Sequence, residues 1–102
     1  MDTARFLIEV QRKAGQPADV RDPLAVTRVF LGACSDGSEA TVLRRLIRAL
    51  VSGRGLFSRA DIDALTNYGA RLGAALIDAH LRGFYKDAEW RAAMLAVARR
   101  AG

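Results

Sequence analysis

The sequence is poor in the residues that build covalent, metal and redox sites. It holds one cysteine, Cys34, and one histidine, His80, in 102 residues. A single cysteine excludes an intramolecular disulfide, and one cysteine with one histidine cannot close a tetrahedral zinc site. Prolines (two) and aromatic residues (7%) are also scarce. We therefore expect neither a metal nor a cofactor.

Long apolar runs are absent as well. None approaches the roughly eighteen residues that a membrane-spanning helix needs, and the first residues lack the charged and apolar regions of a secretory signal. These absences favour a cytoplasmic protein that does not associate with a membrane. The chain is still 51% apolar and has no repeat or long linker, so we expect residues 1–102 to form one helical domain.

Apolar residues recur with helical spacing in five segments, which predicts an all-α, compact single-domain bundle. Capping residues mark the helix ends: Asp22-Pro23 suits an N-cap followed by N1, Ser58 with Asp61 suits a capping box, and Asp87 suits a further N-cap. The predicted helices span approximately residues 3–14, 22–34, 38–52, 58–83 and 87–100.

Two of these helices have distinctive patterns. The second is apolar nearly all round, interrupted only by Thr27 and Arg28, and such a helix is usually central and buried. The fourth is predicted to be the longest. Its expected inner stripe consists of Ile62, Leu65, Gly69, Leu72, Gly73, Leu76 and His80.

Catalytic chemistry finds little support in this sequence. Cys34 and His80 would suit a nucleophile and its base, but no hydrolase signature surrounds the cysteine and nothing brings the two together. The carboxylates that occur in close pairs stand at predicted helix starts, where they stabilise the helix as caps and dipole partners. These residues are Asp36, Glu39, Asp61, Asp63, Asp87 and Glu89. We predict no catalytic residue and no enzyme.

One group of basic residues has no evident role in folding. The chain has a formal net charge of +5 and a pI of about 10.3, and its densest basic group is opposed within residues 39–59 only by Glu39. The members of this group are Arg44, Arg45, Arg48, Arg54 and Arg59. They predict docking onto an acidic protein surface, and phosphate contacts on nucleic acid are the alternative.

The connection between the third and fourth predicted helices could also bind an anion. Gly53-Arg54-Gly55 precedes a helix start at Ser58, and backbone N–H groups there could hold a phosphate with help from Arg54 and Arg59. The spacing matches no nucleotide-binding fingerprint, and a plain helix–helix connection is favoured. A helix-turn-helix interpretation is weakened by Asp61 and Asp63, which would face the phosphates.

Two glycines inside a predicted helix require a packing reason, because each costs about 1 kcal/mol relative to alanine. Gly69 and Gly73 lie four residues apart. They predict either close contact with the second helix or, together with Tyr68, a self-association face.

These observations favour a non-enzymatic binding or regulatory module, such as an adaptor, an assembly factor or an inhibitor of a larger complex. A homo-oligomer is compatible with them. A nucleic-acid-binding protein that uses the same arginines is the alternative. Aromatic anchors for a partner would come from Tyr68, Tyr85 or Trp90.

Overall fold

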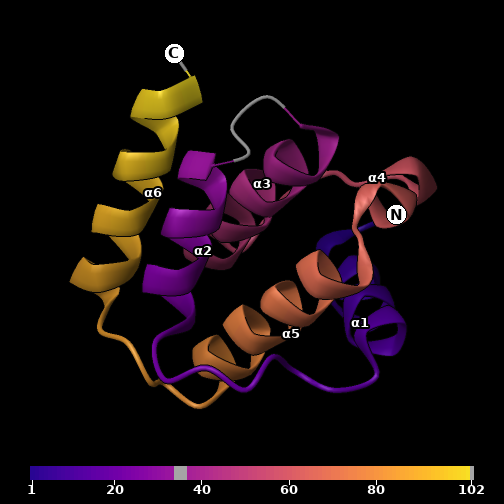
Figure 1. Cartoon of the computed structure of the whole chain (residues 1–102), viewed down its shortest axis with the longest axis horizontal. Helices are drawn as coiled ribbons and strands as arrows, with labels where there is room; N and C mark the ends of the chain where they lie inside the picture. Colours follow the sequence, from indigo (N-terminus) through magenta and orange to yellow (C-terminus); the bar gives the residue numbers. More distant parts are fainter. Residues whose placement is uncertain (34–36, 102) are drawn as a thin grey trace.

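Six α-helices make up the described part of the chain in the computed structural model (Figure 1), which covers residues 1–33 and 37–101, with side chains up to residue 96. They are α1 (Thr3–Ala14), α2 (Pro23–Ala33), α3 (Ser38–Ser52), α4 (Arg59–Ala64), α5 (Asn67–Leu81) and α6 (Asp87–Ala101). No strand occurs among these residues, so the predicted all-α class is confirmed. Cys34 and Asp36 lie outside the described residues.

Most helix ends follow from local chemistry that the sequence already displays. The Asp2 carboxylate accepts a hydrogen bond from the Arg5 N–H (2.9 Å) at the start of α1. Gly15 and Gly53 end α1 and α3 with φ of +74° and +77°, a backbone conformation that favours glycine. At the start of α4, Asp61 accepts the Ser58 N–H (2.8 Å), as the predicted capping box requires.

The predicted fourth helix is wrong in one respect, because it is two helices. Leu65 and Thr66 are extended and separate α4 from α5. The Thr66 hydroxyl caps α5 by accepting the Gly69 N–H (3.1 Å), while Glu39 of α3 accepts both the Thr66 N–H (2.7 Å) and its hydroxyl (2.6 Å). This tertiary contact stabilises the break. As a result α3, α5 and α6 have equal lengths of 15 residues, and the fourth predicted helix is not the longest.

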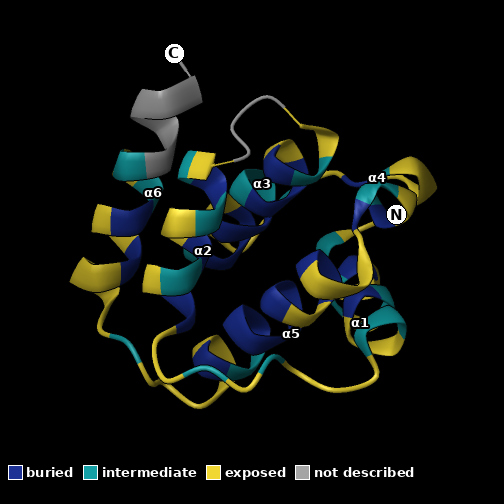
Figure 2. Ribbon diagram, in the orientation of Figure 1, coloured by how far each residue is buried: buried dark blue, intermediate teal, exposed yellow. Residues whose placement is uncertain are grey.

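The centre of the bundle is also not where the sequence pattern places it. The helix enclosed on most sides is α5, which buries nine of its fifteen residues and packs against α1, α2 and α3 (Figure 2). By contrast, α2 buries only Pro23, Leu24, Thr27 and Leu31 and exposes its opposite side. Although α2 is apolar nearly all round, most of its residues are therefore not buried.

The inner faces of the other helices agree with their apolar periodicity. Phe6 and Val10 of α1, the α3 row of Leu43, Leu46, Ile47 and Leu50, and Trp90 with Ala93 of α6 are all buried. Phe6 stacks on Phe57 with ring centroids 3.7 Å apart, which joins α1 to the α3–α4 connection. These contacts form the core around α5.

The segment at Phe84-Tyr85 attaches the start of α2 to the α5–α6 connection. The Tyr85 hydroxyl accepts the Leu24 N–H (3.0 Å) and donates to the Asp22 carboxylate. Asp22 also accepts the Ala25 N–H (3.2 Å), as an N-cap does. Burial, reinforced by the hydrogen bond to Asp22, raises the pKa of Tyr85 to about 12.

No described helix is long and apolar enough to cross a membrane.

Candidate protein-interaction surface

Arg45 of α3 is the structural centre of the predicted arginine group. Its guanidinium pairs with Asp61 (3.0 Å), donates to the Leu56 carbonyl oxygen and lies over the Phe57 ring, 5.0 Å from the centroid. Because Asp61 also caps α4, this one side chain connects α3 to the start of α4. Arg45 therefore shapes the surface as well as contributing charge to it.

A second carboxylate organises the arginines between α1 and α4. Glu9 of α1 lies 3.3 Å from the guanidinium of Arg12 and 3.8 Å from that of Arg59. Lys13 donates to the Ile62 carbonyl oxygen (2.8 Å) at the end of α4. The short helix α4 is thus held from both neighbours by basic side chains.

In these ion pairs the acid lies inside and the base outside. The Glu9 side chain is 12% exposed, whereas those of Arg12 and Arg59 are 73% and 74% exposed. Likewise Asp61 is 15% exposed and Arg45 41%. The carboxylates are shielded, so an approaching partner meets mainly guanidinium groups.

The remaining arginines of the group extend this charge along α3 and its C-terminal turn. Arg48 and Arg54 are exposed and form no ion pair with any described residue, whereas Arg44 is half-buried. We call Arg12, Arg45, Arg48, Arg54 and Arg59 the basic surface. It extends from the region where α1, α3 and α4 meet along α3 to its C-terminal turn (Figure 1).

An exposed apolar residue, Leu56, lies within the basic surface and was not predicted from the sequence. Leu56 is 83% exposed, the highest value among the exposed large apolar residues, and its carbonyl oxygen accepts a hydrogen bond from Arg45. The signal was available: in an extended segment, neighbouring side chains point to opposite sides. Since Phe57 is buried, Leu56 points outward.

In the α3–α4 connection, where an anion site was considered, the N–H groups of Gly53 and Ser58 already donate hydrogen bonds within the protein. The Gly53 N–H donates to the Ala49 carbonyl oxygen (2.8 Å), and the Ser58 N–H is taken by Asp61. A Cβ at Gly55 would lie 2.9 Å from the Phe57 ring, so close packing requires that glycine. The geometry agrees with a plain helix–helix connection.

The glycines of α5 serve packing within the chain. A Cβ on Gly73 would lie 3.1 Å from Val10 and 3.3 Å from Leu46, and one on Gly69 would overlap the Glu39 carboxylate. The close approach predicted for them is found, but to α1 and α3 rather than to α2. Both are buried, and of the predicted self-association residues only Tyr68 is exposed; its ring lies 5.7 Å from that of Phe30.

His80 lies outside the predicted inner stripe. Its side chain is exposed and meets Trp90 edge-on with ring centroids 5.4 Å apart. Within the described residues, no group of three or more histidine, cysteine and acidic side chains could hold a metal ion. Asp2, Asp22, Asp61 and Glu89 accept backbone N–H groups at helix starts, so their chemistry is that of capping.

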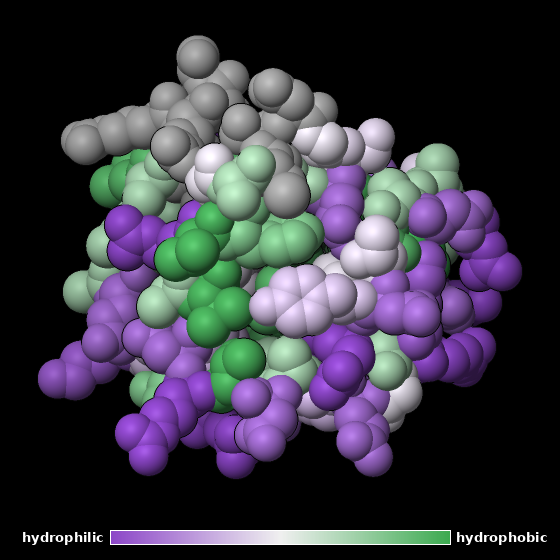
Figure 3. Space-filling model, viewed as in Figure 1, coloured by the Kyte–Doolittle hydropathy of each residue, from purple (hydrophilic) through white to green (hydrophobic). Residues whose placement is uncertain are grey.

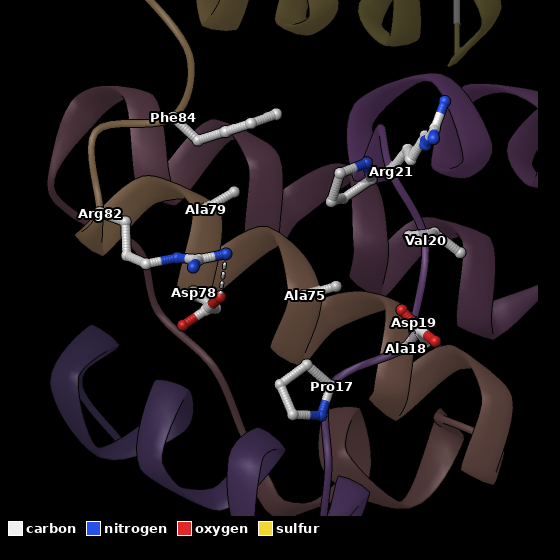
Figure 4. Close-up of a pocket in the computed structure, with 11 residues that line it drawn as sticks. Pro17, Ala18, Asp19, Val20, Arg21, Ala75, Asp78, Ala79, Arg82 and Phe84 are labelled. Atoms are coloured by element: carbon white, nitrogen blue, oxygen red, sulfur yellow. Dashed lines mark ion pairs between the residues drawn. The ribbon is translucent and has the colours of Figure 1, made fainter.

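Three hollows on the described surface are small. One of about 170 Å³ lies beneath the segment 17–21 where this segment crosses α5 (Figure 4). Ala75 and Ala79 line it, and Asp78 is ion-paired with Arg82 at 3.0 Å. Others, of about 210 Å³ and 110 Å³, lie beside α6. Small-molecule sites typically occupy about 300–1,000 Å³, so these hollows are better suited to side chains of a partner.

Comparison with known proteins adds no relative: no family model, no curated protein and no solved structure matches this chain.

Proposed function

We propose that the chain is a non-enzymatic binding module, of the adaptor, assembly-factor or inhibitor type, whose basic surface docks onto an acidic protein. The observation that carries this proposal is the position of Leu56. This apolar side chain projects from among arginines whose own carboxylate partners are shielded. An apolar centre surrounded by a polar rim is the typical anatomy of a protein–protein interface.

The same arrangement favours protein over nucleic acid as the partner. The affinity of a protein for nucleic acid comes largely from contacts with phosphates along the strand, and an exposed leucine makes no such contact. Asp2 and Asp63 are exposed beside the basic surface and would repel a continuous row of phosphates. An acidic protein can place its carboxylates opposite the arginines and a pocket opposite Leu56.

Site-specific crosslinking in the native host tests this proposal. A photo-crosslinking amino acid replaces Leu56, and the matched control carries it at Leu81, which is 72% exposed at the end of α5. We expect one discrete protein adduct from position 56, absent from position 81 and lost when Arg48→Glu and Arg54→Glu are added. Equal adducts from both positions would exclude the basic surface as the docking site.

Nuclease treatment distinguishes the alternative function. An adduct of position 56 that disappears after nuclease treatment would assign the arginines to nucleic acid. Binding to double-stranded and single-stranded DNA and to RNA would then weaken steeply with salt, with a slope set by the number of phosphates neutralised. For the proposed module we expect only weak retention on nucleic acid, unchanged by Leu56→Ser.

A further inference from the structure

The outward side of α2 is apolar and has no neighbour within the described residues. Ala25, Val29 and Ala33 follow one another at four-residue spacing and are exposed, Val29 by 75%. Figure 3 shows a continuous hydrophobic band over this helix. Exposed apolar patches of this kind mark interaction sites in monomeric proteins.

A shallow depression of about 210 Å³ separates this side of α2 from α6, which runs beside α2 in the same direction (Figure 1). Leu24 and Ala25 of α2 and Ala92 and Ala93 of α6 form its apolar lining. Small side chains let another helix approach closely.

The charged residues of the depression lie at two levels along the helix axes, with acidic residues at one level and a basic residue at the other. Asp22 and Glu89 stand at the N-terminal ends of the two helices, and Arg28 stands six residues beyond Asp22, about 9 Å farther along α2. The acidic level and the basic level thus flank the apolar lining along the helix axes.

We infer that this depression is the interface for a second copy of the chain. A two-fold axis that crosses the depression at right angles to α2 exchanges its two levels. Arg28 of each copy then lies against Asp22 and Glu89 of the other, and the apolar linings meet between them. The surface is complementary to itself, which is the requirement for a two-fold dimer.

The distribution of charge agrees with a second copy as the occupant. The net charge of +5 would oppose self-association if it were spread evenly. None of the five arginines of the basic surface, however, lines the depression, so they do not face one another across it. This inference is independent of the proposed function, because it concerns a different surface.

Charge reversal provides a test specific to a two-fold interface. Sedimentation velocity over a wide concentration range should show the wild-type chain approaching twice the monomer mass. Arg28→Glu and Glu89→Arg, each alone, should raise the dimer Kd about tenfold or more, because like charges then face each other. Their equimolar mixture should dimerise again, since the new carboxylate at position 28 of one chain meets the new guanidinium at position 89 of the other.

Three outcomes would overturn the inference. They are a wild-type chain that stays monomeric at every concentration, single variants that dimerise as the wild type does, and a mixture that stays monomeric although both variants are folded. Thermal unfolding of each variant establishes folding separately, which matters because Glu89 also accepts the Lys86 N–H (2.8 Å) at the start of α6. Ile8→Glu on α1, where Ile8 is 52% exposed, is the matched control and should leave dimerisation unchanged.

Discussion

Two helices of similar apolar composition, α5 and α2, have opposite positions in this molecule. Nine of the fifteen residues of α5 are buried, and only four of the eleven in α2. The difference lies in side-chain size. Gly73 allows Val10 of α1 and Leu46 of α3 to approach the α5 backbone, and Ala70, Ala74 and Ala75 present little bulk.

On α2 the bulky side chains do not all point inward. Val29 projects to solvent, and the helix is held by its inner face and by Tyr85 at its start. The comparison shows that the overall apolar content of a helix does not decide which helix becomes central. The helix whose neighbours can approach most closely takes that position, because close approach buries the most apolar surface.

The largest expected effect comes from truncating the enclosed helix. Leu76→Ala removes a fully buried side chain of α5 and should lower the free energy of unfolding by about 3 kcal/mol, through lost burial and the cavity left behind. Urea unfolding followed by circular dichroism measures the change. A loss below about 1 kcal/mol would mean that α5 is not the centre of the core.

The contact that separates α4 from α5 should show strong non-additivity. Glu39→Ala removes two hydrogen bonds to Thr66 and should cost about 1.5 kcal/mol. Gly69→Ala raises the helix propensity of α5, but the new methyl group displaces the Glu39 carboxylate. In the wild-type background the loss of the Glu39 contact therefore cancels the gain in stability. In the Glu39→Ala background the same substitution should stabilise the protein by up to about 1 kcal/mol. Additive effects in the double-mutant cycle would contradict this contact.

The attachment of α2 can be weakened through Tyr85. Tyr85→Phe removes the hydrogen bonds to Leu24 and Asp22 and should cost about 1 kcal/mol at neutral pH. Tyr68→Phe is the matched control, because the Tyr68 hydroxyl makes no hydrogen bond with a described residue; it should change stability little.

The pH dependence of the Tyr85 contribution has a definite sign. The pKa of Tyr85 is raised from 10.0 to about 12 in the folded chain, so the folded state retains a proton that the unfolded state loses. The contribution is fully present below pH 10 and is lost as the pH rises through about 12. Urea midpoints should therefore fall more for the wild type than for Tyr85→Phe across this range. Parallel curves would contradict the shift.

The smallest effect is expected on the open side of α2. Val29→Ala should change the free energy of unfolding by less than about 0.5 kcal/mol in dilute solution, since the side chain is already solvated. The identical substitution Val10→Ala, at a residue with no exposed surface that packs against Gly73, should cost about 2 kcal/mol. Equal losses at the two valines would remove the distinction between enclosed and open helices.

Local chemistry made much of this fold predictable. The N-cap at Asp22 and the capping box at Ser58 were predicted from short-range rules, and the structure confirms both. The ends of α1 and α3 at Gly15 and Gly53 obey rules of the same kind. The break at Leu65-Thr66 did not follow, because the apolar period continues across it and its stabilising partner, Glu39, is 27 residues away. The burial of helices likewise depends on which helices meet, and periodicity does not contain that information.

The candidate surface was partly predictable for similar reasons. Arginine clustering in the sequence indicated Arg45, Arg48, Arg54 and Arg59, all of which belong to the basic surface. Arg12 joins them only because Glu9 bridges α1 to α4, a contact between distant segments. The outward direction of Leu56 was readable in principle from its buried neighbour Phe57.

The position of Trp90 gives the molecule a built-in optical probe. As the only tryptophan, it is 4% exposed on the inner face of α6, with Tyr85 and His80 edge-on to its ring at 5.4 Å each. Its emission therefore reports whether α6 is seated on α3, while far-ultraviolet circular dichroism reports helix content of the whole chain. A red shift in emission that precedes the loss of helicity during unfolding would identify α6 as the first element to detach.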